Sequence, residues 1–230
     1  MWALDQPYDP SPRSFLAGTP WALLAFLAAG LGVGLSAVEL GYLAAAQLST
    51  AVVWTVQIAL AVTAVGWALA DDPACPARAL GLVRGPSRAA LAAAAAIGSG
   101  LSMHLLFTAS RTLGYPIALE RPSQLLSSLV YDIALNVPSA ELFFRAGLFN
   151  RAQRRWSFGP ALALSTLACV VRYLLDPALL KIPEVMLGAV VYVALLSVGN
   201  AWLFWWSGSL IPPLIASLQF FIAYRVLRME

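Results

Sequence analysis

The chain has 230 residues, of which 60% are hydrophobic and only 11% are charged, whereas a soluble domain usually carries about 25% charged residues. Its net charge is +3, and it has no basic helix, aromatic-basic motif or zinc-finger spacing, so we expect no nucleic-acid partner. With a mean hydropathy of +0.78, this composition predicts an all-α fold, a polytopic integral membrane helical bundle.

Apolar runs of membrane-spanning length follow one another along most of the chain. Residues 1–13 are polar and rich in proline, and we expect an N-terminal polar tail there. Residues 14–230 are expected to form a single membrane domain of about seven transmembrane helices (roughly six to eight), since each crossing takes roughly 20 apolar residues. The runs cover residues 14–38, 43–70, 89–109, 124–150, 159–175, 183–206 and 210–226.

The fourth run, residues 124–150, contains Pro138. A proline inside a helix removes a backbone hydrogen bond and kinks or breaks the helix. We therefore expect either one long helix here or a pair of helices broken near Pro138.

The distribution of cations predicts the orientation of the loops. Counts of lysine and arginine favour loops 71–88 and 151–158 on the cytoplasmic side. Arg225 and Arg228 do not fit this count, which leaves a re-entrant segment or a run made of two short helices as explanations. Trp67 is expected near a membrane interface. The alanine-rich composition suggests a bacterial plasma membrane.

An acid and a base stand four residues apart within the fourth run. Glu141 and Arg145 share one helix face at this spacing, and ionisable residues at membrane depth are usually paired and functional. Two interpretations remain open, an intramembrane polar site and an ion pair that locks helix packing. Asp132 and Asn136 lie on the approach to Glu141, so they could extend a polar chamber.

Three stretches in the second half of the chain carry a resemblance to a known family. Residues 140–145 read Ala-Glu-Leu-Phe-Phe-Arg, residues 165–177 read Ser-Thr-Leu-Ala-Cys-Val-Val-Arg-Tyr-Leu-Leu-Asp-Pro, and residues 207–210 read Ser-Gly-Ser-Leu ahead of Pro213. The region 124–226 resembles the core of the CPBP family of intramembrane proteases, which includes the CAAX prenyl endopeptidases and the bacteriocin-immunity (Abi) proteins. The resemblance implies several membrane helices around a polar chamber.

The chain departs from that family at four motif positions. The family motifs are Glu-Glu-x-x-x-Arg, Phe-x-x-x-His and His-x-x-x-Asn, and the resemblance implies that the first Glu activates water while the His and Asn side chains bind that water or the oxyanion. Glu141 and Arg145 match the first motif. The positions of the first Glu, the two His and the Asn are held by Ala140, Tyr173, Ser217 and Phe221.

None of these four replacements supplies a base near neutral pH, because alanine and phenylalanine exchange no proton and tyrosine and serine only hydrogen-bond. We therefore predict a catalytically degenerate pseudo-protease, acting as a binding, scaffold or accessory subunit for a membrane protein, a transmembrane-helix partner or lipids. One alternative is an active intramembrane CAAX-type endopeptidase with a rearranged site at Glu141.

Another alternative, a pigment- or lipid-binding accessory subunit, depends on His104, the single histidine. One histidine cannot build a structural zinc site, so we expect no metal site. Apart from a pigment or haem at His104, we expect no cofactor. His104 could supply one axial bond to a pigment magnesium or a haem iron, although a hydrogen bond to a neighbouring helix is the interpretation that we favour.

Four further residues have simpler expected roles. Arg172 either enters the chamber or extends to the headgroups, and we favour the headgroups because Asp176 follows closely. Asn200 and Gln219 are expected to form ordinary interhelical hydrogen bonds. Cys169 is expected to be a small core residue, since no histidine stands beside it to activate a thiol.

Overall fold

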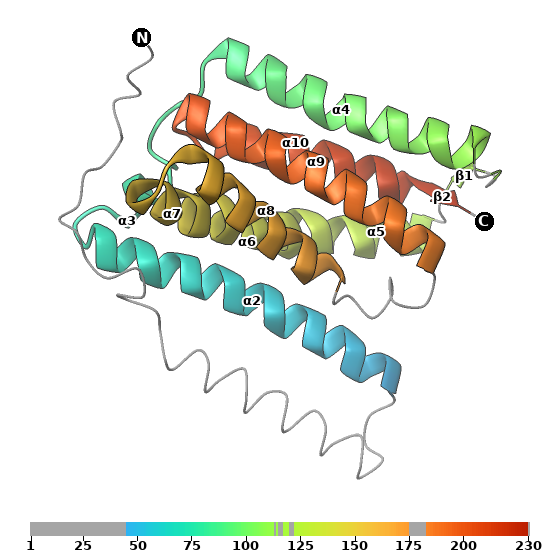
Figure 1. Cartoon of the computed structure of the whole chain (residues 1–230). Helices are drawn as coiled ribbons and strands as arrows, with labels where there is room; N and C mark the ends of the chain where they lie inside the picture. The colour runs from blue at the N-terminus through green and yellow to red at the C-terminus, as the bar shows by residue number, and fades with distance from the viewer. Residues whose placement is uncertain (1–44, 113, 115–116, 120–121, 175–182, 230) are drawn as a thin grey trace.

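The computed structural model describes residues 45–112, 114, 117–119, 122–174 and 183–229, and these residues form a helical bundle (Figure 1). The tail at 1–13 and the first expected span at 14–38 lie outside the described residues. The helices are α2 (Ala45–Asp71), α3 (Pro76–Ala79), α4 (Arg88–Arg111), α5 (Pro122–Tyr131), η1 (Asp132–Asn136), α6 (Val137–Glu141), η2 (Leu142–Phe149), α7 (Asn150–Arg155), α8 (Phe158–Leu174), α9 (Pro183–Ser207) and α10 (Ile211–Val226).

The prediction of a helical membrane bundle is confirmed. Among the described residues, three helices are long and apolar enough to cross a membrane, at Ala51–Asp71, Arg88–Arg111 and Val190–Ser207. Two shorter apolar helices, Phe158–Leu174 and Ile211–Ala223, accompany them. The predicted apolar runs within the described residues coincide with helices to within a few residues at their ends, because hydrophobic length is a strong signal in membrane chains.

Five consecutive elements, from Pro122 to Arg155, form one long helical run. Two of them, η1 and η2, are π-helical, and η1 ends directly before the turn that contains Pro138. A π-helical stretch widens the turn, which accommodates the missing proline N–H without breaking the helix. Of the two expectations for this segment, the single long helix is therefore the one observed.

Several segments meet at one end of the bundle, which we call the Arg151 end. Arg151 Nη2 lies 2.6 Å from Asp71 Oδ1, and the backbone N–H of Leu210 donates to the carbonyl of Gly81 at 3.0 Å. Figure 1 shows α3 and α7 together at this end, and β1 and β2 at the other. The expectation that loops 71–88 and 151–158 share one side agrees with this arrangement.

The opposite end carries a short two-stranded ladder that we did not predict. Strand β1 (Ile117–Leu119) pairs antiparallel with β2 (Leu227–Met229). Helix α10 begins at the Arg151 end and leads directly into β2. The chain at residues 225–228 thus lies at the end of the bundle opposite loops 71–88 and 151–158. This position explains why Arg225 and Arg228 did not fit the count of cations that placed those loops on the cytoplasmic side.

Small residues allow close helix contacts in the interior. A Cβ added to Gly98 of α4 would lie 2.6 Å from the carbonyl oxygen of Ala216 in α10, so these two helices touch through their backbones. A Cβ on Gly147 would lie 2.9 Å from the ring of Trp67. Trp67 is only 5% exposed, so its indole packs inside the bundle against Gly147, where a larger residue would not fit.

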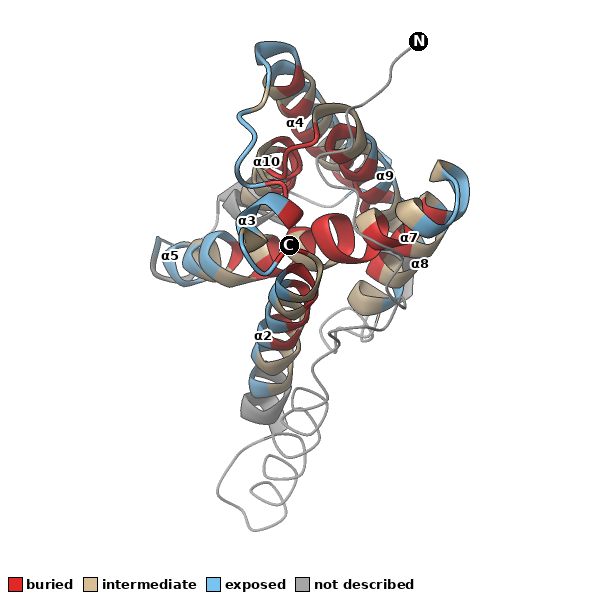
Figure 2. Ribbon diagram, turned by 90° about the vertical axis from the view of Figure 1, so that its left-hand side faces the viewer, coloured by how far each residue is buried: buried red, intermediate tan, exposed pale blue. Residues whose placement is uncertain are grey.

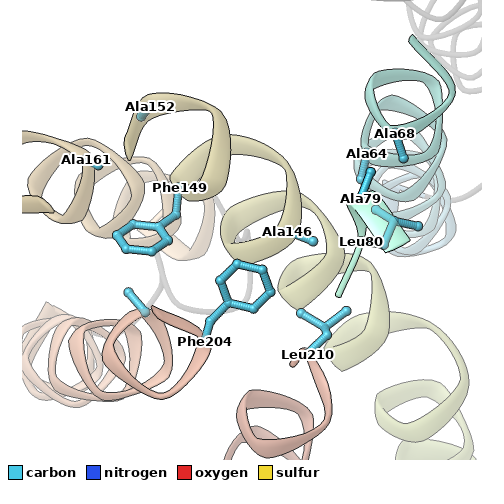
Figure 3. Close-up of a cluster of buried hydrophobic side chains, with 11 residues drawn as sticks. Ala64, Ala68, Ala79, Leu80, Ala146, Phe149, Ala152, Ala161, Phe204 and Leu210 are labelled. Atoms are coloured by element: carbon cyan, nitrogen blue, oxygen red, sulfur yellow. The ribbon is translucent and has the colours of Figure 1, made fainter. Parts of the chain in front are cut away.

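Burial follows the inner sides of the helices, while exposed residues mark the outer sides of α2 and α4 (Figure 2). One cluster of buried side chains joins α2, η2 and α9 near the Arg151 end (Figure 3). In it Phe149 and Phe204 meet edge to face, with ring centroids 6.4 Å apart. Alanines from the neighbouring helices surround the two rings, which allows the helix axes to approach closely.

Candidate functional site

The Glu141 carboxylate lies in the bundle interior, where three helical elements meet. Its Oε1 atom accepts hydrogen bonds from Asn200 Nδ2 of α9 at 2.8 Å and from Ser217 Oγ of α10 at 2.7 Å. Asn200 Nδ2 also donates to Ser217 Oγ at 2.7 Å. All three side chains are buried. The two neutral donors hold one carboxylate oxygen in a fixed position, because both bonds are charge-assisted.

Arg145 completes this group, which we call the Glu141 layer: Glu141, Arg145, Ser197, Asn200 and Ser217. The Arg145 Nε atom lies 3.3 Å from Glu141 Oε2, and Nη2 donates to Ser197 Oγ at 3.0 Å. Ser197 passes the contact on to Thr166 Oγ1 of α8 at 3.2 Å. The layer thus links the long central helix to α8, α9 and α10.

The Glu141 layer is not fully satisfied. Glu141 Oε2, Arg145 Nη1 and Asn200 Oδ1 are buried and have no hydrogen-bond partner among the described residues. The contact between Arg145 and Glu141 is therefore an attraction between charges without the alignment of a hydrogen bond. In a low-dielectric interior such an attraction is strong, and so is the penalty for each polar atom without a partner.

The motif positions that lost their polar groups are filled with apolar surface. Tyr173 and Phe221 stack on each other with ring centroids 5.8 Å apart and an interplanar angle of 20°. Ala140 is buried in an apolar cluster with Trp67, Phe144 and Cys169, among others. Two of the positions that would line a polar chamber thus form an aromatic stack instead, and a third packs in the hydrophobic core.

A second polar group lies nearer the start of the long helix, and we call it the Asn136 layer: Gln57, Asp132, Asn136, Ser139 and Arg172. Asn136 Oδ1 accepts from Gln57 Nε2 at 2.7 Å, and its Nδ2 donates to Asp132 Oδ1 at 2.9 Å. Ser139 Oγ donates to Gln57 Oε1 at 2.6 Å. Asp132 is fully buried, so these contacts replace the water that its carboxylate would otherwise need.

Arg172 belongs to this second layer. Its Nη2 atom donates to Asn136 Oδ1 at 3.2 Å, and its guanidinium lies 4.2 Å from the centroid of the Tyr173 ring. The structure thus places Arg172 against the chamber residues, which is the alternative to the headgroup position that we favoured from the sequence. The stacking on Tyr173 gives the guanidinium a reason to turn inward, because a cation is attracted to an aromatic face.

His104 lies apart from both layers. Its Nδ1 atom is 2.6 Å from the Tyr192 hydroxyl of α9, and that hydroxyl donates to Thr108 Oγ1 at 3.2 Å. The side chain is exposed on the outer surface of the bundle. This geometry is the hydrogen bond to a neighbouring helix that we favoured. The axial-ligand interpretation stays a prediction, to be tested by an absorbance spectrum of the purified protein.

Cys169 is buried and free, as expected for a core residue. In the part of the chain that the structure describes, no group of three or more His, Cys, Asp or Glu side chains could hold a metal ion. Within the Glu141 layer the titratable side chains are Glu141 and Arg145. The layer can hold a charge in place and accept hydrogen bonds. Its arginine stays protonated and cannot act as a base.

Besides Ser139 and Ser197, sequence reasoning missed two members of these layers. Asn200 was treated as an ordinary interhelical contact, but it donates to the one carboxylate of the Glu141 layer. Gln57 was not singled out at all, although it is fully buried and bonds to Asn136 and Ser139. In both cases an uncharged polar residue in a long apolar helix was the available signal, since such residues face the protein interior.

A comparison with known protein families finds a match in the region that holds the site. Residues 122–218 match the family model described as type II CAAX prenyl endopeptidase Rce1-like. The match covers the long helix, α8, α9 and the first half of α10, which contribute every residue of the Glu141 layer. No curated protein and no solved structure matches the chain. This match supports membership of the CPBP/CAAX protease family for the part of the chain that holds the site.

Proposed function

We propose that this member of the CAAX protease family is a pseudo-protease, which keeps the membrane scaffold of the family to bind a membrane partner rather than to hydrolyse a peptide. Such a protein would act as a scaffold or accessory subunit in a membrane complex. The bacterial plasma membrane, suggested by the composition, is the membrane that we propose for it.

The observation that carries this proposal is the stack of Tyr173 on Phe221. These residues occupy the positions of a His and the Asn in the family motifs, where an active member would bind water or an oxyanion. Two stacked rings offer no hydrogen-bond donor or acceptor on their faces except the single Tyr173 hydroxyl. Water that enters beside these rings would therefore lack the His and Asn side chains that orient it in an active member.

The surroundings of Glu141 support the same interpretation. Its Oε1 atom is engaged by Asn200 and Ser217, and Arg145 lies beside Oε2. A general base acts together with neighbouring side chains that orient the attacking water and stabilise the oxyanion. The contacts of Glu141 favour a structural or binding role for this carboxylate.

The rearranged-peptidase alternative would need a second acid or a histidine near Glu141. Asp132 was the acid that the sequence offered, and its carboxylate accepts from Asn136 in the other polar layer. His104 contacts Tyr192 and Thr108 on the outside of the bundle. No described contact connects either side chain with Glu141, and the pseudo-protease therefore accounts for the geometry with fewer assumptions.

A partner helix would find several apolar faces on the outside of the bundle. On α9, four exposed residues follow one helical stripe, which are Val191, Leu195, Val198 and Trp202. On α2 a similar exposed stripe is formed by Trp54, Ile58, Val62, Val65 and Leu69. Faces of this kind suit either lipid or a transmembrane helix, so they do not by themselves select the partner.

Two measurements test the proposal together. In the first, the purified protein in liposomes is incubated with a farnesylated peptide ending in a CaaX sequence, and products are followed by mass spectrometry. We expect no cleavage that differs between the wild type and Glu141→Gln. Cleavage by the wild type that is lost in Glu141→Gln would establish the peptidase and overturn the proposal.

In the second measurement, the tagged chain is purified from native membranes in a mild detergent. The proposal predicts a membrane protein that co-purifies in a fixed stoichiometric ratio and is retained by Glu141→Gln if that variant folds. A chain that purifies alone from crosslinked native membranes would contradict the scaffold role.

A further inference from the structure

An exposed apolar tip lies at the Arg151 end, on the segment between α3 and α4. Leu82 is 43% exposed and Val83 is 62% exposed. Every other large hydrophobic residue that is exposed in the described part of the chain lies on a helix, except Trp156, which directly follows α7. Leu82 and Val83 therefore present apolar surface at the end of the bundle, where a helix face cannot account for it.

The segment that carries this tip, which we call the Arg84 loop (residues 80–87), is held firmly by the bundle. Asn150 Nδ2 donates to the carbonyl of Ala79, and the N–H of Leu210 donates to the carbonyl of Gly81. Gly81 has a φ of +69°, and an added Cβ there would lie 2.9 Å from the Phe204 ring. The loop thus projects Leu82 and Val83 outward from a fixed base.

Arginines surround the exposed tip. Arg78 precedes it, Arg84 follows it directly, and Arg88 is the first residue of α4. All three side chains are exposed. Arg78 lies 3.9 Å from Asp72, while Arg84 and Arg88 form no ion pair with an acid of the described residues. The Arg84 guanidinium packs over Gly208, so it has a defined position beside the tip.

The acids at this end do not neutralise these cations. Segments 71–88 and 150–158 contain six arginines and two aspartates. Asp71 is bound by Arg151 and Arg154, and Asp72 accepts from the N–H of Cys75 at 3.0 Å. An excess of positive charge remains on the outer surface of this end, where it surrounds an apolar tip.

We infer that the Arg84 loop is a binding site for anionic phospholipid, with Leu82 and Val83 inserted among the acyl chains and Arg78, Arg84 and Arg88 bound to headgroup phosphates. Clusters of arginine next to a transmembrane helix recognise anionic lipid, and the planar guanidinium pairs well with phosphate. An apolar tip among these cations distinguishes a lipid surface from a soluble acidic partner, which would leave Val83 in water. The inference does not depend on whether Glu141 is catalytic.

The first experiment uses a single fluorescent label. Val83→Cys in a Cys75→Ser background is labelled with an environment-sensitive dye, and the full chain is reconstituted in vesicles of phosphatidylcholine with or without phosphatidylglycerol. We expect a blue-shifted emission and quenching by lipids that carry a spin label near the headgroup, with stronger quenching in the phosphatidylglycerol vesicles. The Cys75→Ser background without the new cysteine controls for labelling of Cys169.

The second experiment compares charge variants. Lipid affinity is measured by native mass spectrometry with phosphatidylglycerol added to the purified chain. Replacing Arg78, Arg84 and Arg88 by Gln one at a time is expected to weaken binding by about fivefold each at low salt, and the exposed Arg155→Gln at the same end serves as the matched control. Leu82→Ser with Val83→Ser should weaken binding while leaving the charge unchanged.

Two results would overturn the inference. One is a label at Val83 that is quenched by aqueous iodide to the same extent in both kinds of vesicle, because the tip would then lie in water or against a soluble partner. The other is equal lipid affinity in the Arg84→Gln and Arg155→Gln variants, because the loop would then have no preference beyond the general positive charge of this end.

Discussion

Two arginine–carboxylate pairs in this molecule have similar chemistry and different structural consequences. Glu141 and Arg145 lie four residues apart on one helix, with side chains 6% and 1% exposed and a closest approach of 3.3 Å. Asp71 and Arg151 come from different helices, with side chains 12% and 7% exposed. Arg151 donates to both carboxylate oxygens, at 2.6 and 3.2 Å.

This difference identifies the contacts that hold the helices together. The Asp71 pair joins α2 to α7 directly. The Glu141 pair lies within one helical run, so by itself it joins nothing; the connections to α9 and α10 come from Ser197, Asn200 and Ser217. The interior pair therefore presents two charges to neutral partners on other helices. The hydrogen bonds of these partners connect the long helix to α9 and α10.

The largest expected effect comes from removing one charge of the interior pair. Arg145→Leu leaves the Glu141 carboxylate buried without its counter-charge, and breaking a buried pair in this way costs about 3–5 kcal/mol. We expect a much lower midpoint for thermal unfolding in detergent. The double variant Glu141→Leu with Arg145→Leu should recover most of the loss, since an apolar replacement of both partners is often neutral. A single variant as stable as the wild type would contradict the coupling of these charges.

A smaller effect is expected from the neutral partner on α9. Asn200→Leu removes the donor to Glu141 Oε1, and a hydrogen bond to a charged group contributes about 1.5–3 kcal/mol. Denaturant unfolding of the purified variant measures this loss. If the loss in the Asn200→Leu variant is unchanged when Glu141→Gln is also present, then the two side chains are not coupled and the Glu141 layer is wrongly described.

The pair at the end of the bundle should respond less and in a salt-dependent way. Asp71→Asn is expected to cost about 1 kcal/mol, near the upper range for ion pairs with access to solvent. Added salt should reduce the difference between Asp71→Asn and the wild type, because salt screens charges near water much more than buried ones. The effect of Arg145→Leu should stay constant over the same salt range. A salt-dependent effect of Arg145→Leu with a constant effect of Asp71→Asn would contradict the difference in burial between the two pairs.

The smallest effect sets the baseline for an uncharged interhelical contact. Tyr192→Phe removes the hydroxyl that contacts His104 and Thr108, and hydrogen bonds between membrane helices average about 0.6 kcal/mol. A double-mutant cycle with His104→Ala isolates the pair. If the coupling energy between Tyr192 and His104 is as large as that between Asn200 and Glu141, the charge of Glu141 does not strengthen its hydrogen bond.

The sequence predicted the helices better than the contacts between them. Hydrophobic length located α4 and α9, and the four-residue spacing placed Glu141 and Arg145 on one face, because both signals are local. The contacts of Glu141 with Asn200 and Ser217 span 59 and 76 residues along the chain. No periodicity within one helix reports which residue of another helix lies opposite.

Local geometry also misled the prediction at two places. The π-helical stretches η1 and η2 rotate the faces of the long helix relative to a regular α-helix. The residues of other helices that contact Asp132 and Asn136 could therefore not be derived from α-helical spacing. Arg172 lies near the end of α8, where a headgroup position is the usual expectation. Its inward turn depends on Asn136 and Tyr173, and the contact with Asn136 is visible only in three dimensions.

We propose that the Glu141 carboxylate is kept as a held charge in a bundle that does not hydrolyse peptides. The most direct test is the rate of cleavage of prenylated and unmodified peptide libraries by the wild-type chain in liposomes, compared with Glu141→Gln. We expect both proteins to give the background rate of liposomes without protein. A rate above that background which disappears in Glu141→Gln would contradict it.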